Sequence, residues 1–528
     1  MNDVREKCAN THVIHRPDPP MRLSHLVLTL FYLAGPLLVI SELFTPTLSI
    51  PILVLGAAYI VLLGLDLFRL DFAEAEVKRA SQVVGGLAAF ALSVAWVLHS
   101  GIGSFAICRW DYVKHNLIFS YLLDQRLPIF TSLAGQDFIV HYSFAYYISP
   151  VRLYQLAHAL APSITLNSVL LAIYSLSLFL ATSLLYRGRM TRALVLLAIL
   201  CLAGGLDTVG MLAFGVEPRG EVSTFWGIVR VPFNLDWWGI PYAPQSFTMN
   251  LYYAPQHFFA ALIGTALVYA CFQSSQPAAL RLIESSIVIT ASVFWSPYVA
   301  VGLTALALVL ALSFDAPETI LQRLRREGVS VLAPSYLIVL AFAVVLTIAA
   351  SLFLLASKSL SFPQLIFHKD NMDDWLITYG ANYAPYLLAL ILVAWPFRKF
   401  TTEDAAAKLC CPALPKILAG CLAASGLLLA FGHGFYNDWG MRATLPLSIG
   451  LAVGVTQVLF SNLKRTYLVA LLAVLAVSSA SSLSEIARSM IVPTNCKNYG
   501  AFRLEDMRDL APQYEGRSDS LLYRHLVR

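Results

Sequence analysis

Long apolar stretches follow one another along most of the chain and are separated by shorter polar connections. A helix that crosses a bilayer needs about 20 mostly apolar residues. The pattern therefore predicts an all-α, polytopic membrane protein with about 13 transmembrane helices. The predicted spans cover residues 23–41, 48–68, 82–99, 164–186, 192–214, 256–273, 278–296, 298–314, 334–357, 383–397, 415–432, 444–461 and 466–484.

The boundary between the seventh and eighth spans is the least obvious, because residues 282–313 are almost continuously apolar. We place it at Ser296-Pro297, since proline disfavours helix at the preceding residue and removes a backbone donor. Lysine and arginine crowd the cytoplasmic connections of membrane proteins. With the N-terminus inside, every even-numbered connection is basic, whereas merging these two spans would move the basic cluster at 323–326 outside. The charge pattern thus favours the break and a cytoplasmic N-terminus.

The connections on the outer side are unequal in length. Long, structured loops in compact proteins usually carry function. We expect residues 1–484 to form a transmembrane core and residues 485–528 a short extracytoplasmic tail. The outer connections cover residues 100–163, 215–255, 358–382 and 433–443.

The segment 138–158 in the first long loop is also apolar, but another span there would reverse the charge pattern downstream. Phe138, Tyr142 and Tyr146 recur at four-residue spacing. This spacing predicts an aromatic helix that lies in the outer membrane interface.

Composition narrows the class of protein further. Of the 528 residues, 58% are hydrophobic and 13% are charged, which excludes an ordinary soluble enzyme and a disordered chain. The 36 Lys and Arg residues and the 31 Asp and Glu residues leave a net charge of +5 without a basic stripe, so nucleic acid is not an expected partner.

The 8 cysteines show no spacing that is typical of a zinc site. Cys201, Cys271 and Cys421 fall in or beside predicted spans, where we expect them to be small core residues. Cys108 and Cys496 both fall outside, which permits a disulfide between the first long loop and the tail.

The densest polar cluster is the segment 109–116, shortly after the third predicted span. If this segment is helical, Asp111, Lys114 and His115 share one face. A carboxylate beside a cation and an imidazole can handle a proton while it holds a phosphate group. The alternative is a solvated helix start with an internal ion pair.

A second cluster, Asn437, Asp438 and Arg442, precedes the twelfth predicted span. An arginine at the edge of an apolar run is costly unless it has a function or a partner. Arg442 is therefore a candidate phosphate ligand. The alternative is an arginine that reaches toward water or pairs with Asp438.

Further candidates come from three other places. Asp207 lies late in the fifth predicted span, where a substrate contact and a structural hydrogen bond are both plausible. His257 opens the sixth span, where it would bind phosphate with the helix N-terminus or serve in capping. Trp238 in the second long loop is a candidate for stacking on a sugar, and acidic residues at 370–374 are candidates for a divalent cation.

Four short motifs, WDYVKHN (110–116), GLD (205–207), PQH (255–257) and NDWGMR (437–442), together resemble a bacterial branch of the GT-C glycosyltransferases. More distantly, the first motif is similar to the arabinofuranosyltransferases of mycobacterial cell walls. The resemblance covers residues 100 to 460 and implies a multi-spanning enzyme that uses polyprenyl-phosphate-linked sugars. Two features depart from this pattern: the aspartate follows the third span rather than the first, and the soluble C-terminal domain of many relatives is missing.

The resemblance implies that Asp111 is the catalytic base in the outer loop. It would deprotonate an acceptor hydroxyl, which attacks the anomeric carbon as the polyprenyl phosphate leaves, with inversion. Lys114, His115, His257 and Arg442 would stabilise the leaving phosphate. We expect Asp207, Tyr146, Trp238, Asn437 and Asp438 to contact the substrate.

The expected partners are a polyprenyl-phosphate sugar donor, a glycan, lipid or protein acceptor, and the bilayer of a bacterial inner membrane. The residues assign no cofactor, and the acidic residues leave a divalent cation open as an option. The alternatives are a transporter or flippase for lipid-linked sugars, an O-antigen-type ligase or polymerase, and a structural subunit. A carrier would have charges distributed through its spans, whereas the ionisable residues here cluster on one side.

Overall fold

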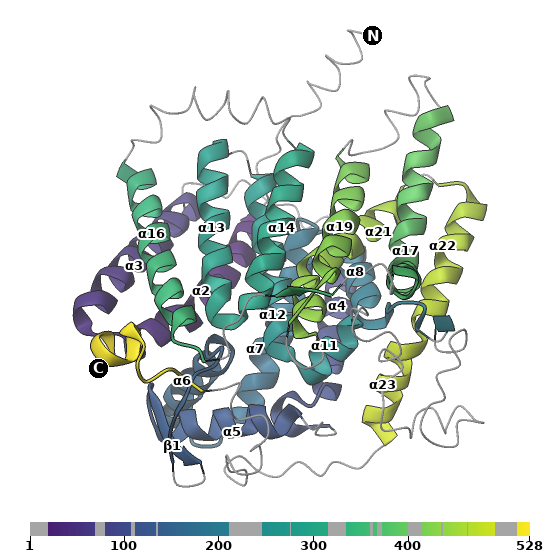
Figure 1. Cartoon of the computed structure of the whole chain (residues 1–528). Helices are drawn as coiled ribbons and strands as arrows, with labels where there is room; N and C mark the ends of the chain where they lie inside the picture. Colours follow the sequence, from purple (N-terminus) through teal and green to yellow (C-terminus); the bar gives the residue numbers. More distant parts are fainter. Residues whose placement is uncertain are drawn as a thin grey trace.

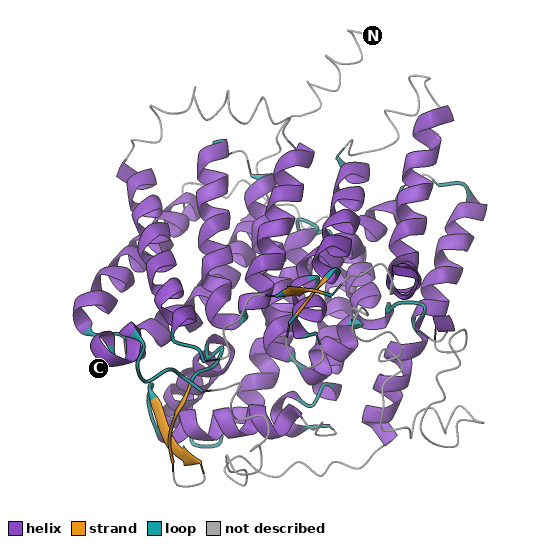
Figure 2. Ribbon diagram, viewed as in Figure 1, coloured by secondary structure: helices purple, strands orange, loops and turns teal. Residues whose placement is uncertain are grey.

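The computed structural model describes residues 19–68, 80–106, 111–133, 136–207, 209–210, 245–274, 276–314, 334–358, 363–366, 372–399, 413–433, 437–461, 463–491 and 515–527. Most of these residues lie in helices that form a bundle (Figure 1, Figure 2). In this described part, ten helices are long and apolar enough to cross a membrane, or up to eleven if a bent pair is one span. The protein is therefore a multi-pass membrane protein, as its hydrophobic pattern predicts.

Nine of the ten candidate spans are single helices, and the tenth combines two consecutive helices. The single helices are α2 (Pro19–Leu43), α3 (Pro46–Phe68), α4 (Ala80–His99), α7 (Leu166–Leu185), α12 (Pro255–Gln273), α13 (Ala278–Trp295), α14 (Pro297–Phe314), α16 (Pro334–Leu355) and α17 (Met372–Lys399). The tenth span joins α20 (Asp438–Ala443) to α21 (Leu445–Leu459).

The remaining predicted spans correspond to shorter or bent helices. The helices α8 (Met190–Leu202) and α19 (Leu414–Leu429) are apolar but shorter than a full span. The helices α22 (Arg465–Ser478) and α23 (Ala480–Ile491) meet at an angle of 44°. Every predicted span thus overlaps an apolar helix, while the described residues support a count of ten to eleven.

The fifth predicted span is wrong at its end, because α8 stops at Leu202. Beyond it, the backbone pairs with neighbouring helices: the Gly204 amide donates to the Ser478 carbonyl, and the Leu206 amide to the Ala381 carbonyl, each at 2.9 Å. At Gly205, a β-carbon would lie 2.6 Å from the Cα of Asn382, so α17 packs directly on this segment. The close contact explains why the helix gives way to a loop here.

The break at Ser296-Pro297 is confirmed. The helix α13 ends at Trp295, and α14 begins at Pro297. Ser296 is extended, with φ −172° and ψ 110°, which is the conformation that a following proline favours.

Two interfacial helices and a hairpin cover one end of the bundle. The helix α5 (Asp111–Asp124) runs across the lower end of the bundle in Figure 1, close to β1 (Ile129–Leu133) and α6 (Ala145–Leu160). The strand β1 pairs antiparallel with β2 (Gln136–Val140). A second small sheet joins β3 (Gln364–Leu365) and β4 (Phe431–Gly432), so the fold is predominantly rather than purely helical.

The aromatic helix predicted for residues 138–158 is wrong in its first part. Phe138 lies in β2, Tyr142 lies in the following loop, and only Tyr146 is helical, in α6. Aromatic residues suit a strand as well as a helix face, and pairing with β1 decides the conformation here.

The helix α12 lies at the centre of the bundle and is buried almost throughout, packed against α7, α13, α14 and α21. Around it, Trp295 stacks on Tyr32 with ring centroids 5.4 Å apart and donates from Nε1 to the Tyr32 carbonyl at 2.9 Å. At Gly302 in α14, a β-carbon would meet the Ala443 carbonyl oxygen at 2.0 Å. The absence of a side chain at Gly302 therefore lets α20 approach the centre of the bundle.

The end of the chain returns to the same end of the bundle as α5. Residues 515–527 include a π-helical turn, Leu522–Leu526, whose Leu526 carbonyl accepts from the Thr45 amide at 2.7 Å. Gly516 donates to the Ile139 carbonyl in β2. The boundary expected at residue 484 falls inside α23.

Candidate active site

The start of α5 carries the first group of charged side chains. Asp111 and Lys114 lie one turn apart, and Lys114 Nζ is 3.2 Å from Asp111 Oδ1. The Lys114 side chain is 12% exposed and that of Asp111 is 35% exposed. From Asp111 onward the segment is helical, which is the condition under which Asp111 and Lys114 share a face, and the ion pair that was weighed as an alternative is present.

The pKa of Asp111 reflects two opposing effects. Burial raises the pKa, but the charge and hydrogen bond of Lys114 and the more distant charge of Arg442 lower it and prevail. The pKa therefore lies below its usual value, and Asp111 is ionised at neutral pH. Arg442 is close enough to act on this carboxylate although the two residues are far apart in the sequence.

His115 is buried, and both of its ring nitrogens have protein partners. Nε2 donates to the Tyr253 carbonyl at 3.1 Å, because a carbonyl can only accept, and Nδ1 accepts from the Tyr147 hydroxyl at 2.7 Å. Burial lowers the pKa of His115 to about 3, so the ring is neutral. This arrangement leaves neither nitrogen open to a phosphate, and His115 instead ties α5 to α6 and to α11 (Phe247–Tyr253).

The first turn of α12 contributes two polar side chains beside α5. His257 is buried, and its Nδ1 lies 2.6 Å from the Ser296 hydroxyl. Gln256 donates from Nε2 to the Tyr142 hydroxyl at 2.9 Å. The corner between α13 and α14 thus fixes the imidazole of His257 at the N-terminus of α12.

The short helix α20 places Arg442. Its N-cap is Asn437, in the left-handed conformation with φ 58°, and the Asn437 side-chain oxygen accepts from the amides of His433 and Gly440 at 3.2 and 3.1 Å. Asp438 opens the helix, 3.8 Å from Arg442 Nη2. The contacts of Asn437 are those of a structural cap rather than of a substrate ligand.

The guanidinium of Arg442 is 7% exposed and is held on one edge. Its Nη1 donates to Gln245 Oε1 at 2.8 Å and to Asn250 Oδ1. Its Nε is buried and has no hydrogen-bond partner within the described part of the chain. Arg442 therefore keeps an unused donor in a buried position, while Asp438 at 3.8 Å forms the ion pair that was weighed as the alternative. A buried donor without a partner is costly, and an anion that binds there would satisfy it.

Tyr142 links the two groups of charges. Burial raises the pKa of its phenol, as do the carboxylates of Asp438 and Asp111, whereas Lys114 lowers it. The hydroxyl therefore lies within the electrostatic reach of charged residues from both α5 and α20. The sequence pattern placed Tyr142 only in an interfacial helix, and nothing in that pattern marks it as part of this site. Gln245 and Asn250 were also missed, although Asn250 is a lone amide in the aromatic stretch of α11.

Two predicted substrate ligands, Asp207 and Tyr146, are buried among protein partners. Asp207 is 1% exposed and accepts from the Ser481 hydroxyl at 3.2 Å, at the start of α23. Tyr146 is also 1% exposed and stacks on Tyr174 beneath α5. The contacts of Asp207 match the structural alternative, and those of Tyr146 are contacts of a core residue.

Other predictions fall outside the described residues. These are Trp238, the pairing of Cys108 with Cys496, and Asp370 of the acidic segment at 370–374. The other two acidic residues of that segment, Asp373 and Asp374, lie exposed in the first turn of α17. Cys201, Cys271 and Cys421 are buried free thiols, as predicted. Within the described residues, no three His, Cys, Asp or Glu side chains gather into a group that could hold a metal ion.

Comparisons with known proteins identify no relative. No protein family matches the chain, and no curated protein or solved structure shows significant similarity to it. The chemistry of this site therefore has to be argued from its own residues.

Proposed function

We propose that the protein is an inverting glycosyltransferase of the GT-C type, which moves a sugar from a polyprenyl-phosphate donor to an acceptor outside the cytoplasm. The observation that carries this proposal is the combination of the ion-paired carboxylate of Asp111 with the buried guanidinium of Arg442, whose Nε has no partner among the described residues. A carboxylate and a buried cation with spare donors are the two groups that such a transfer requires.

In this mechanism, the ionised Asp111 accepts the proton of an acceptor hydroxyl while the oxygen attacks the anomeric carbon. The bond between that carbon and the phosphate oxygen breaks, and negative charge grows on the leaving polyprenyl phosphate. Arg442 and Lys114 stabilise this charge, which is greater in the transition state than in the bound donor. Because a single displacement occurs, the anomeric configuration inverts.

The ion pair between Lys114 and Asp111 suits this sequence of events. Lys114 keeps the carboxylate ionised before the reaction. As the donor phosphate arrives, the same ammonium group can turn toward it, which weakens its hold on Asp111 and makes the carboxylate a better base. His115 acts as a positioning residue, since its hydrogen bonds hold α5 against α11.

The test is transfer of radiolabelled sugar from a panel of polyprenyl-phosphate donors by the full-length protein in proteoliposomes. We expect Asp111→Asn to reduce transfer by roughly 10²–10⁴-fold, the usual cost of losing a general base. Asp124→Asn changes an exposed carboxylate on the last turn of the same helix and should leave transfer unchanged. Equal activity of the two variants would remove Asp111 from the mechanism.

The main alternative is a carrier for lipid-linked sugars, and one observation favours it. Arg281 and Glu284 are both buried inside the candidate span α13, at the end of that helix far from Ser296 and the site. This is an exception to the expectation that ionisable residues gather on one side. A labelled donor that crosses proteoliposomes equally well with Asp111→Asn but not with Glu284→Gln would favour the carrier.

A further inference from the structure

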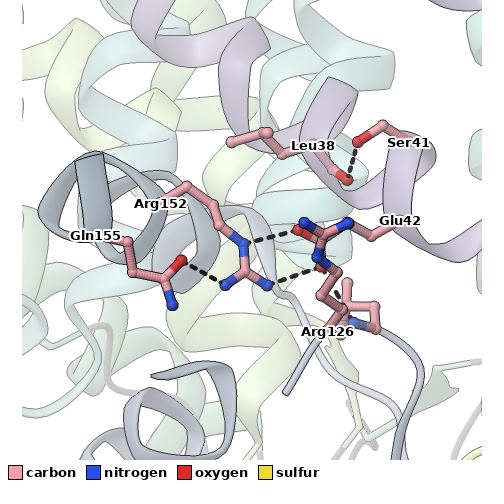
Figure 3. Close-up of a pocket in the computed structure, with 7 residues that line it drawn as sticks. Leu38, Ser41, Glu42, Arg126, Arg152 and Gln155 are labelled. Atoms are coloured by element: carbon pink, nitrogen blue, oxygen red, sulfur yellow. Dashed lines mark hydrogen bonds and ion pairs between the residues drawn. The ribbon is translucent and has the colours of Figure 1, made fainter. Parts of the chain in front are cut away.

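A pocket lies beyond the C-terminal end of α5, which is the end opposite Asp111. It has a volume of about 480 Å³ and opens between the last turn of α2, the residues that follow α5, and the middle of α6 (Figure 3). The helix α5 has 14 residues and is therefore about 20 Å long. This pocket is thus separate from the site around Asp111. Its lining residues are Leu38, Ser41, Glu42, Arg126, Leu127, Arg152 and Gln155.

The floor of the pocket is an ion pair whose charges cancel. Arg152 donates from Nε to Glu42 Oε1 at 2.7 Å and from Nη2 to Glu42 Oε2 at 2.9 Å. Its Nη1 donates to Gln155 Oε1 and to the Leu122 carbonyl, and its Nη2 also donates to the Gln125 carbonyl at 3.4 Å. Glu42 Oε2 also accepts from the Leu127 amide at 3.1 Å. This network uses every N–H group of Arg152, so Arg152 holds α2, α5 and α6 together and is not free to bind a ligand.

Unlike Arg152, Arg126 is available to bind a ligand. It is exposed, it lines the same pocket, and it makes no hydrogen bond or ion pair with any residue that the structure describes. Among the described residues that line the pocket, Glu42 and Arg152 neutralise each other, so the remaining charge is the positive charge of Arg126. A guanidinium offers a planar fork of donors that matches the oxygens of a phosphate group.

The position of the pocket indicates where such a phosphate would come from. The candidate span in α2 ends at Leu43, so Glu42 lies where that helix leaves the membrane. On α6, Leu156 follows Arg152 by one turn and is 61% exposed, and Leu153 and Leu160 beside it are 46% and 81% exposed. A cationic pocket at the membrane surface that continues into an exposed leucine stripe matches an amphiphile with an anionic head.

From this arrangement we propose that the pocket binds the phosphate group of an anionic lipid. The guanidinium of Arg126 holds the phosphate, and the leucine stripe of α6 lies along the acyl chains. This site is independent of the proposed transferase activity and involves no covalent step.

The experiment is a titration of the full-length protein in mild detergent with phosphatidylglycerol, followed by native mass spectrometry. We expect Arg126→Gln to weaken binding about tenfold, which is ~1.4 kcal/mol. Arg126→Lys keeps the charge and should retain part of the affinity. Arg524→Gln removes an exposed arginine from the C-terminal turn and serves as the matched control, with unchanged affinity expected.

The same titration is repeated with phosphatidylcholine and with inorganic phosphate. Weaker binding of phosphatidylcholine than of phosphatidylglycerol in the wild-type protein would support the proposal. Arg126-dependent binding of inorganic phosphate without any preference for phosphatidylglycerol would overturn the lipid assignment. Unchanged phosphatidylglycerol affinity in Arg126→Gln, or an equal loss in Arg524→Gln, would overturn the site itself.

Discussion

The interaction of Lys114 with Asp111 makes a quantitative prediction about pH dependence. At 3.2 Å, two unit charges interact by about 5 kcal/mol at an effective dielectric constant of 20 and by about 1.3 kcal/mol in bulk water. Because the Asp111 side chain is 35% exposed, solvent screening brings the interaction close to the lower figure. A change of about 1.4 kcal/mol corresponds to one pKa unit.

Replacing Lys114 with glutamine removes the largest influence that lowers the pKa of Asp111, while burial, which raises it, remains. The pKa of Asp111 should therefore rise by about one unit. The reaction needs the ionised carboxylate, so activity is lost as the pH falls through this pKa. The acid limb of the pH–rate profile should consequently move to higher pH by about one unit in Lys114→Gln.

The assay is sugar transfer in proteoliposomes, measured from about pH 2.5 to pH 8 for both the wild-type and variant proteins, so that the range includes pH values below the usual pKa of an aspartate. Lys114→Arg keeps the positive charge and is the matched control, with an acid limb close to that of the wild type. A uniform drop in rate with no shift of the limb would show that Lys114 acts only on the donor. A shift to lower pH would refute the electrostatic reasoning.

Three further predictions concern other parts of the site. Arg442→Ala should weaken donor binding more than acceptor binding, measured as separate KM values, and equal losses would indicate a purely structural role. His115→Phe should lower the free energy of unfolding in detergent by roughly 1–3 kcal/mol, since it removes the hydrogen bonds to the Tyr147 hydroxyl and the Tyr253 carbonyl. An unchanged melting temperature would contradict the contribution of these hydrogen bonds. Gly302→Ala should lower the free energy of unfolding by about 1–3 kcal/mol, because the added methyl group overpacks against Ala443. The control is Gly380→Ala, where a β-carbon meets nothing within 4 Å and the change should be neutral or stabilising. Similar melting temperatures for the two variants would argue against close packing at Gly302.

The approximate positions of the membrane helices follow from the sequence alone. An apolar run of sufficient length forms a helix in a bilayer because its backbone can be satisfied in no other simple way. The same local logic correctly identified the break at Ser296-Pro297 and the helical face shared by Asp111 and Lys114. These features depend on neighbours within a few residues.

The local sequence pattern did not predict the conformation of segments that form hydrogen bonds with distant parts of the chain. The strand around Phe138 depends on β1, and the end of α8 depends on the backbone contacts of Gly204 and Leu206 with α22 and α17. In isolation, both segments are compatible with helix. Their conformations are decided by hydrogen bonds to residues that the sequence does not mark as neighbours.

The composition of the candidate site was decided by tertiary structure. The sequence contains Asp111 and Arg442 as isolated motifs, but only packing, such as that of α20 against α14 at Gly302, places Arg442 within electrostatic reach of Asp111. Packing also occupies both nitrogens of His115, buries Tyr146 and brings Tyr142 among the charges. Hydrophobic length is a property of each segment alone, whereas the state of a buried polar group depends on every partner that surrounds it.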